Sequence, residues 1–194
     1  ENLQAFYKKY YQPDNAVLLV AGKIDEASTL KLIEEYFGSI PRPTRSLVDV
    51  PTIEPVQDGE RTVVLRRVGD TQALAAGYHI MPGSHADYPA MDVVVELLTN
   101  EPSGRLYKKL VETKKVSYQY GYSFSLKEPG FVYFGTELLK EKSIEDAKKT
   151  LLNTLDSVAI VVPTKDEVER AKTKLLKDFE LAFKSSDRLG LAMS

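Results

Sequence analysis

A strict alternation over residues 116–124 constrains the fold more than any other feature of this sequence. A repeat of two residues places successive side chains on opposite faces, so this stretch predicts a β-strand. One face would carry Val116, Tyr118, Tyr120, Tyr122 and Phe124, and the other would carry Ser117, Gln119, Gly121 and Ser123. The loop SLKEPG leads to a second strand pattern over 131–138, which predicts an antiparallel pair.

Three further strands are predicted nearer the start of the chain. The unbroken apolar run over 16–21 is typical of a strand buried on both faces. Residues 62–67 and 71–80 also have strand patterns, and Gly69-Asp70 between them indicates a hairpin turn. In the last of these strands, alternate residues would share one apolar face: Leu74, Ala76, Tyr78 and Ile80.

Helices are predicted from apolar spacing and from capping residues. They are expected in the opening twelve residues and after Asp25, Asp87, Ser103, Ser143 and Thr164. The last two starts have capping-box patterns, because Asp146 and Glu167 follow their caps by three residues. Locally paired strands followed by clustered helices predict an α+β fold with a largely antiparallel sheet covered by helices.

The domain organisation is predicted to be one α+β domain over residues 1–194. Residues 41–60 contain Pro41, Pro43, Pro51 and Pro55, so we expect an internal extended strap there. About 40 residues precede the strap, too few for an independent core. The opening helix has no capping residue, so we expect the chain to be a fragment of a longer one.

Composition excludes several function classes. The chain has 26 basic and 28 acidic residues and a net charge of -2, which argues against a nucleic-acid partner. No apolar run approaches the roughly 20 residues that span a bilayer, and no signal-peptide pattern opens the chain, so no membrane partner is expected. Cysteine is absent, which excludes disulfides, thiolate metal sites and a cysteine nucleophile.

Few residues in the sequence suggest catalysis or metal binding. His79 and His85 are six residues apart and lack the carboxylate of a helical zinc motif, so they are interpreted as surface or capping histidines. Asp92 and Glu96 lie four residues apart and could share a cation or an acid–base task, but a solvated helix face explains them better. Ser123 lies along a strand rather than at a nucleophile elbow and is discounted.

The tyrosine row of the alternating strand has two readings that the residues leave open. Tyr118, Tyr120 and Tyr122 can pack as core, or their hydroxyls can contact a substrate backbone. A peptide could also add as a strand at the edge of this sheet. No glycine-rich fingerprint or P-loop supports nucleotide chemistry.

Four stretches along nearly the whole chain resemble the pitrilysin/insulinase family of zinc metallopeptidases, which includes the mitochondrial processing peptidases. They are FYKKYYQPDNAVLLVAGKID, EEYFGSIPRP, SGRLYKKLVETKKVSYQYGYSF and PTKDEVERAKTKLLKDF. In that family a half-molecule has two similar α+β domains, and two halves close over an unfolded peptide. The resemblance implies that this chain is a second domain.

The resemblance also implies where zinc lies. The inverted zinc motif belongs to the first domain and is missing here, so no cofactor is expected in this chain and zinc is expected in the parent protein. The family's partner half uses an arginine, and a tyrosine seven residues later, to polarise the scissile carbonyl. Here Tyr118 matches the tyrosine but Val111 holds the arginine position. That departure fits a second domain of the zinc-bearing half, in which Tyr118 is structural.

The favoured function is therefore a non-catalytic domain of a zinc metalloendopeptidase that forms the chamber wall and helps hold extended peptide. Tyr118 and Tyr120 are the candidate substrate-binding residues. The expected partners are a zinc-bearing first domain of the same chain, a second half-molecule or homodimer partner, and peptide substrate. The alternative is a non-peptidase assembly scaffold with the same fold. An independent enzyme using Tyr118 with His79 or His85 lacks a nucleophile–base set. The resemblance favours a bacterial periplasmic location and leaves cytoplasm and organelle matrix open.

Overall fold

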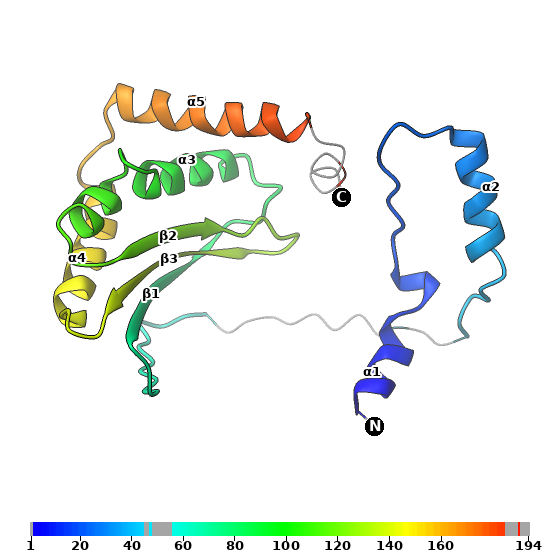
Figure 1. Ribbon diagram of the computed structural model, residues 1–194, viewed down its shortest axis with the longest axis horizontal. Coiled ribbons are helices and arrows are strands. Elements are labelled where there is room, and N and C mark those ends of the chain that lie inside the picture. Colours follow the sequence, from blue (N-terminus) through cyan, green and yellow to red (C-terminus); the bar gives the residue numbers. More distant parts are fainter. Residues whose placement is uncertain (1, 45–46, 48–55, 185–189, 191–194) are drawn as a thin grey trace. The chain divides into compact units, whose positions relative to one another are not determined.

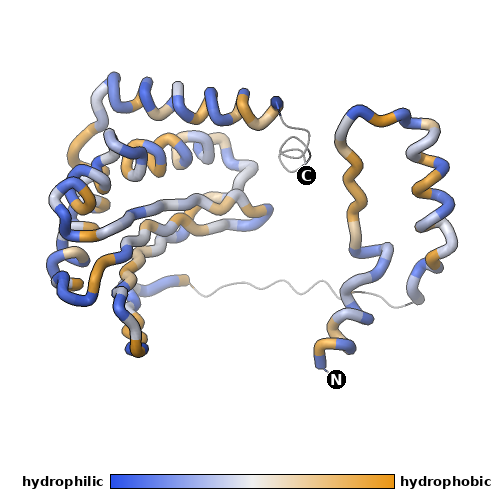
Figure 2. Tube along the Cα trace, in the orientation of Figure 1, coloured by the Kyte–Doolittle hydropathy of each residue, from blue (hydrophilic) through white to orange (hydrophobic). Residues whose placement is uncertain are grey.

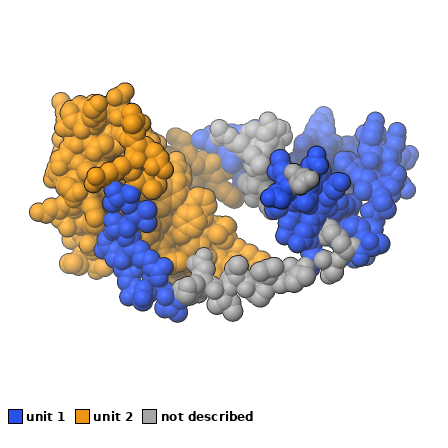
Figure 3. All heavy atoms as spheres, turned by 90° about the horizontal axis from the view of Figure 1, so that it is seen from below, with its two compact units in different colours: residues 1–64, 180–194 blue, residues 65–179 orange. Residues whose placement is uncertain are grey.

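The computed structural model of the chain describes residues 2–44, 47, 56–184 and 190 (Figure 1). It divides into two compact units, shown in different colours in Figure 3. The first unit comprises residues 1–64 and 180–194, and the second comprises residues 65–179. The single domain predicted over 1–194 remains a prediction, and so does the strap at 41–60, much of which lies outside the described residues.

The first unit contains the two helices predicted there, α1 (Asn2–Tyr10) and α2 (Glu26–Phe37), with a short 3-10 turn at Pro13–Asn15. The Asp25 carboxylate caps α2 by accepting a hydrogen bond from the Ser28 backbone N–H at 2.9 Å. This hydrogen bond to the charged form lowers the pKa of Asp25. At the other end, the Gly38 N–H donates to the Glu34 carbonyl.

The strand predicted over residues 16–21 is not formed. Figure 2 shows the run between α1 and α2 as strongly hydrophobic, and its backbone is extended, but it belongs to no β-ladder that the structure describes. Val17 is 96% exposed, so the run is not buried on both faces. An apolar run specifies a strand only together with a hydrogen-bonded neighbour, and local sequence does not provide that neighbour.

The second unit is built on a three-stranded antiparallel sheet in the order β1-β3-β2. The strands are β1 (Thr71–Ile80), β2 (Tyr118–Ser123) and β3 (Gly130–Leu139). The antiparallel pair predicted from the alternating stretch is confirmed as β2 and β3. Residues 62–67 form no strand in the described chain, so the prediction of a hairpin at Gly69-Asp70 was wrong. β1 pairs instead with β3, which lies far along the sequence.

The second unit also contains helices after Asp87, Ser103, Ser143 and Thr164, where the sequence predicts them. They are α3 (Tyr88–Thr99), a π-helix (Tyr107–Val111), α4 (Ile144–Asp156), a 3-10 turn (Ser157–Ala159) and α5 (Lys165–Ala182). Ser143 caps α4 by accepting from the Asp146 N–H at 3.2 Å. At the start of α5, the Thr164 hydroxyl accepts from the Glu167 N–H, and the Glu167 carboxylate accepts from the Thr164 N–H. The short helix predicted after Ser103 is a π-helix instead.

The core of this unit lies between the helices and one face of the sheet. The register places even residues of β1 and β3 and odd residues of β2 on that face. The buried side chains include Leu98, Leu106, Leu110, Val132, Phe134, Leu138 and Leu151. The α+β fold with a helix-covered antiparallel sheet is thus confirmed. Among the helices that the structure describes, none has the length and apolar character needed to cross a bilayer.

Candidate functional site

The other face of the sheet carries a group of rings that we call the aromatic face. It consists of Tyr118, Tyr120, Tyr122, Phe124, Phe131 and Tyr133. The register explains this grouping, because Tyr122 lies opposite Tyr133 and the Phe124 N–H donates to the Phe131 carbonyl at 3.0 Å. Tyr118, Tyr120, Tyr122 and Phe124 therefore share one face, as the alternation predicts, and it is the face away from α3. Val116 was predicted on the same face, but it precedes β2 and is buried in the core.

The rings of the aromatic face contact one another in a continuous band. Centroid separations are 5.8 Å for Tyr118–Tyr120, 6.0 Å for Tyr120–Tyr122 and 5.7 Å for Tyr122–Tyr133. Phe124 and Phe131 stack at 4.6 Å with an interplanar angle of 23°. Offset and tilted contacts at these separations are favourable for aromatic rings. The band is therefore held in place by its own members.

Gly135 lets the band lie close to the sheet. A Cβ at this position would lie 2.3 Å from Cζ of Tyr120, so the Tyr120 ring covers the glycine backbone. Partial burial is the main cause that raises the pKa of Tyr120, and the neighbouring Tyr133 and Glu137 add to it. Tyr120 thus presents a neutral phenol at physiological pH.

Exposure excludes a core position for two members of the tyrosine row. Tyr118 is 49% exposed and Tyr122 is 51% exposed, so neither belongs to the core. Phe124 and Phe131 are also exposed. Large apolar side chains gathered on one uncovered face mark an interaction surface more often than an ordinary one. The two candidate residues from the sequence, Tyr118 and Tyr120, both lie on this face.

β1 contributes mostly small side chains to the sheet surface beside the rings. Its residues on the same face are Thr71, Ala73, Ala75, Gly77 and His79, and all are exposed. Gly77 lies opposite Tyr133, and Ala75 lies opposite Gly135. Ala73, Ala75 and Gly77 form a strip of small residues, which we call the lane of small residues. Because these side chains are much shorter than the aromatic rings, the surface over β1 lies lower than the surface over the ring band.

The helix-covered face explains the serine and one carboxylate singled out in the sequence. The Ser123 hydroxyl donates to Oδ1 of Asp92 at 2.7 Å, and both side chains are partly buried. The interpretation of Asp92 as part of a solvated helix face was therefore wrong, because α3 turns it toward β2. Ser123 has a structural hydrogen bond, which agrees with discounting it as a nucleophile.

Two buried polar groups were missed by the sequence reasoning. Gln119 and Thr136 are cross-strand neighbours and are 2% and 0% exposed. The Gln119 amide nitrogen donates to the Thr99 carbonyl at 2.7 Å. Gln119 Oε1 and Thr136 Oγ1, however, have no hydrogen-bond partner in the described part of the chain. Alternation predicted the face of both residues, but not their burial.

The two histidines belong to different segments. His79 is on β1, and His85 is in the turn before α3, where its Nδ1 accepts from the Asp87 N–H at 3.1 Å. Within residues 2–44, 47, 56–184 and 190, no cluster of three histidine or acidic side chains could hold a metal ion. The donor set that the described residues offer therefore does not fit a zinc site.

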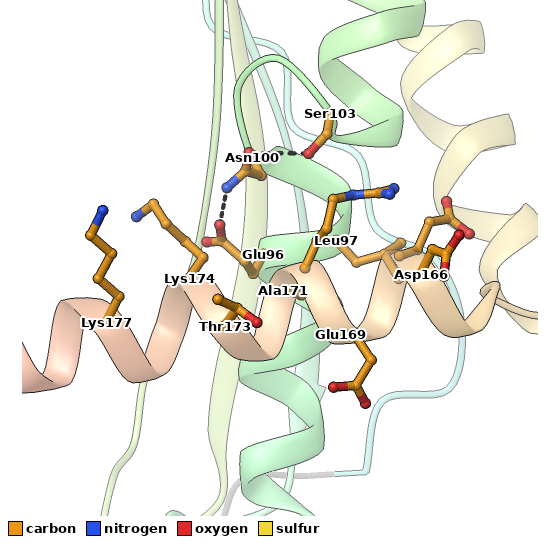
Figure 4. Close-up of a pocket in the computed structure, with 12 residues that line it drawn as sticks. Glu96, Leu97, Asn100, Ser103, Asp166, Glu169, Ala171, Thr173, Lys174 and Lys177 are labelled. Atoms are coloured by element: carbon orange, nitrogen blue, oxygen red, sulfur yellow. Dashed lines mark hydrogen bonds between the residues drawn. The ribbon is translucent and has the colours of Figure 1, made fainter.

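A cavity of about 570 Å³ lies between the second half of α3 and α5 (Figure 4). Its lining includes carboxylates such as Glu96 and Asp166 and cations such as Arg170 and Lys177. Glu96 accepts a hydrogen bond from the side chain of Asn100. Because both signs of charge line the cavity, it offers no uniform field for an ionic ligand. No sequence pattern predicted this cavity.

An ion pair joins the turn before the π-helix to the start of α5. Arg105 donates to both carboxylate oxygens of Glu167 at 3.0 Å and also to the Val161 carbonyl at 3.0 Å. The Arg105 hydrogen bond is the main cause that lowers the pKa of Glu167 to about 2, and the Thr164 N–H adds to it. This pair ties two segments of the helical layer together.

Val111 is the last residue of the π-helix and packs, partly buried, against the core. It occupies the position where the resemblance would place a carbonyl-polarising arginine. A valine has no charge or hydrogen-bond donor, so it cannot stabilise a developing oxyanion. The seven-residue spacing between Val111 and Tyr118 is present without its cation.

Comparison with known proteins gives one consistent family. The family model described as "Peptidase M16 inactive domain" matches residues 1–175. The zinc protease PqqE of Helicobacter pylori is 28% identical over 192 residues, a match that covers 96% of this chain and 43% of that protein. The chain therefore spans less than half of this curated relative.

Solved structures agree with this match. A protease from Helicobacter pylori has a TM-score of 0.86 and 26% identity, covering 97% of this chain and 46% of its own. An inactive peptidase domain from Bordetella parapertussis has a TM-score of 0.59 and 34% identity, covering 67% of this chain and 71% of its own.

Proposed function

Since the chain belongs to the peptidase M16 family, whose inactive-domain model it matches over residues 1–175, we propose that it forms the non-catalytic domain of a zinc-dependent metalloendopeptidase. Zinc and hydrolysis then belong to a first domain elsewhere in the same parent chain. Two findings support this division: the relative named zinc protease is more than twice as long as the matched region, and the described residues here do not fit a zinc site.

The aromatic face carries the second part of the proposal. It forms part of the wall of a substrate chamber and helps hold an extended peptide, with Tyr118 and Tyr120 in contact with it. The supporting observation is a band of half-exposed rings on the sheet face opposite the core. Ring faces pack against side chains of many kinds, and phenol hydroxyls can hydrogen-bond to any peptide backbone. Binding of this kind tolerates many sequences.

The remaining partners follow from this arrangement. A second half-molecule, or a second copy of the parent protein, would close the chamber over the peptide. The parent's own zinc-bearing domain would supply the water-activating metal, since a zinc-bound water ionises near neutral pH. The role of this domain is to position the peptide and not to act on the scissile bond.

The test uses the intact parent protein with a chelator, so that peptide binds without being cleaved. Tyr118 and Tyr120 are both changed to alanine, and a fluorescent unfolded peptide is titrated by anisotropy. Loss of two contact rings should weaken binding by about tenfold. The matched control is Tyr11→Ala with Tyr36→Ala, because these two tyrosines are also exposed.

Equal weakening by both double variants would contradict the proposal, as would an unchanged dissociation constant in the Tyr118/Tyr120 variant. Near-ultraviolet circular dichroism of each variant checks that the fold is retained. A parent protein that binds no unfolded peptide at all would instead favour the assembly-scaffold alternative.

A further inference from the structure

One carboxylate lies on the aromatic face. Glu137 is an odd residue of β3, so its side chain points to the same side as the rings. It lies directly opposite Tyr118 on β2 and opposite Ala73 on β1. The carboxylate thus has a tyrosine ring on one side and a small methyl group on the other.

Glu137 is exposed and has no ion pair or side-chain hydrogen bond in the described part of the chain. Two lysines of adjoining segments pair with carboxylates other than that of Glu137. Lys115 pairs with Asp146 at 3.1 Å, and Lys140 lies 3.8 Å from Asp70. The charge of Glu137 is therefore not compensated by either of them.

The rings next to Glu137 attract a positively charged ligand, as the carboxylate does. A cation over the face of a tyrosine ring is attracted by the negative face of the π system. The register places Glu137 directly opposite Tyr118, and the centroids of Tyr118 and Tyr120 are 5.8 Å apart. The charge of Glu137 also contributes to the raised pKa of Tyr120. A carboxylate beside two phenol rings is a cation-binding arrangement.

The lane of small residues accommodates the rest of such a ligand. Lysine and arginine have apolar stems that pack along low apolar surface while the charged end remains accessible to water. Ala73 and Ala75 provide that surface beside Glu137, since they lie on the same face of β1. An acidic side chain would be repelled by the carboxylate at the same place.

We propose that Glu137, Tyr118 and Tyr120 form a subsite that binds the cationic end of a lysine or arginine side chain of the extended peptide. The inference rests on the proposed function and adds the class of side chain that the face selects. It makes the aromatic face selective at one position and sequence-tolerant elsewhere.

The experiment compares two sets of peptides on the intact parent protein in the presence of a chelator. Each peptide carries a single lysine, placed at successive positions, and its partner has norleucine there, which keeps the stem and removes the charge. The Glu137→Gln variant should bind the best lysine peptide about three- to fivefold more weakly, as expected for one partly exposed charge contact. Its affinity for the norleucine partner should not change.

Glu141→Gln is the matched control, because Glu141 is exposed in the turn after β3 and does not belong to the aromatic face. It should alter neither affinity. Salt should weaken binding of the lysine peptide to the unmodified protein more than to the Glu137→Gln variant.

Equal affinities of Glu137→Gln and the unmodified protein for every lysine peptide would overturn the inference, and so would an equal loss with lysine and norleucine. The Tyr118/Tyr120 double variant separates the two claims. If the double variant binds both peptides more weakly while Glu137→Gln binds each peptide as tightly as the unmodified protein does, the cation subsite is wrong and the proposed function stands. If it weakens neither peptide, both claims fail.

Discussion

At the scale of single residues, two buried threonines have the same exposure and different surroundings. Thr136 and Thr154 are both fully buried. The Thr154 hydroxyl donates to the Thr150 carbonyl at 2.7 Å, whereas Thr136 Oγ1 has no partner in the described chain. A buried polar atom without a partner loses its hydrogen bonds to water and gains none in the protein, which destabilises the folded state.

Thr136→Val should therefore leave the free energy of unfolding unchanged or raise it by up to about 1 kcal/mol, because a methyl group replaces an unpaired hydroxyl. Thr154→Val should lower it by about 1 kcal/mol, since one hydrogen bond is lost. Urea denaturation of both variants measures the difference. A larger loss for Thr136→Val than for Thr154→Val would show that Thr136 has a partner, such as a buried water shared with Gln119.

At the scale of elements, the ion pair of Arg105 with Glu167 fixes the start of α5. Their side chains are only 14% and 22% exposed, so the pair is screened less than a surface pair. The pKa of Glu167 is lowered in the folded state, to about 2 from its ordinary 4.5. The ionised Glu167 carboxylate therefore stabilises the folded state fully above pH 4.5, and this stabilisation is lost as the pH falls toward 2.

Glu167→Gln should lower the free energy of unfolding at neutral pH by about 2 kcal/mol, the contribution of a charge-assisted double hydrogen bond. The difference from the unmodified protein should shrink between pH 4.5 and 2. Thermal unfolding over a pH series measures it. Glu169→Gln, which removes an exposed pair with Lys172, should cost less than about 0.5 kcal/mol at every pH. A difference for Glu167→Gln that does not vary with pH would contradict this account.

The same scale shows what the sequence can and cannot predict. The capping pairs of Ser143 and Thr164 predicted two helix starts, because a cap acts on residues only three positions away. Strict alternation likewise predicted which side chains of β2 share the aromatic face. The strands expected at 16–21 and 62–67 are not formed, because a strand requires a hydrogen-bonded partner that often lies far along the chain. β1 found its partner about 60 residues later.

The candidate site divides in the same way. Tyr118 and Tyr120 could be placed on one face from the alternation alone. Their neighbours Tyr133 and Glu137 come from another strand and depend on the register, which the sequence leaves undetermined without the intervening turn. The pair of Arg105 and Glu167 spans 62 residues and has no local pattern at all.

At the scale of the whole molecule, we propose that the zinc ligands lie in the part of the parent protein outside this chain. The double variant His79→Asn, His85→Asn of the intact protein should therefore keep the zinc content of the unmodified protein. Atomic absorption after extensive dialysis measures it, and added chelator should still remove the metal. A loss of zinc in the double variant would contradict the assignment.

The central claim is that unfolded peptide lies against the aromatic face. Its most direct test places a photoreactive benzoylphenylalanine at position 122 of the intact protein, where Tyr122 is half exposed. A second protein carries it at position 109, an exposed lysine of the π-helix. After illumination with labelled peptide and chelator, the account predicts a covalent adduct at position 122 and none at position 109. Adducts of equal yield at both positions, or at position 109 alone, would contradict it.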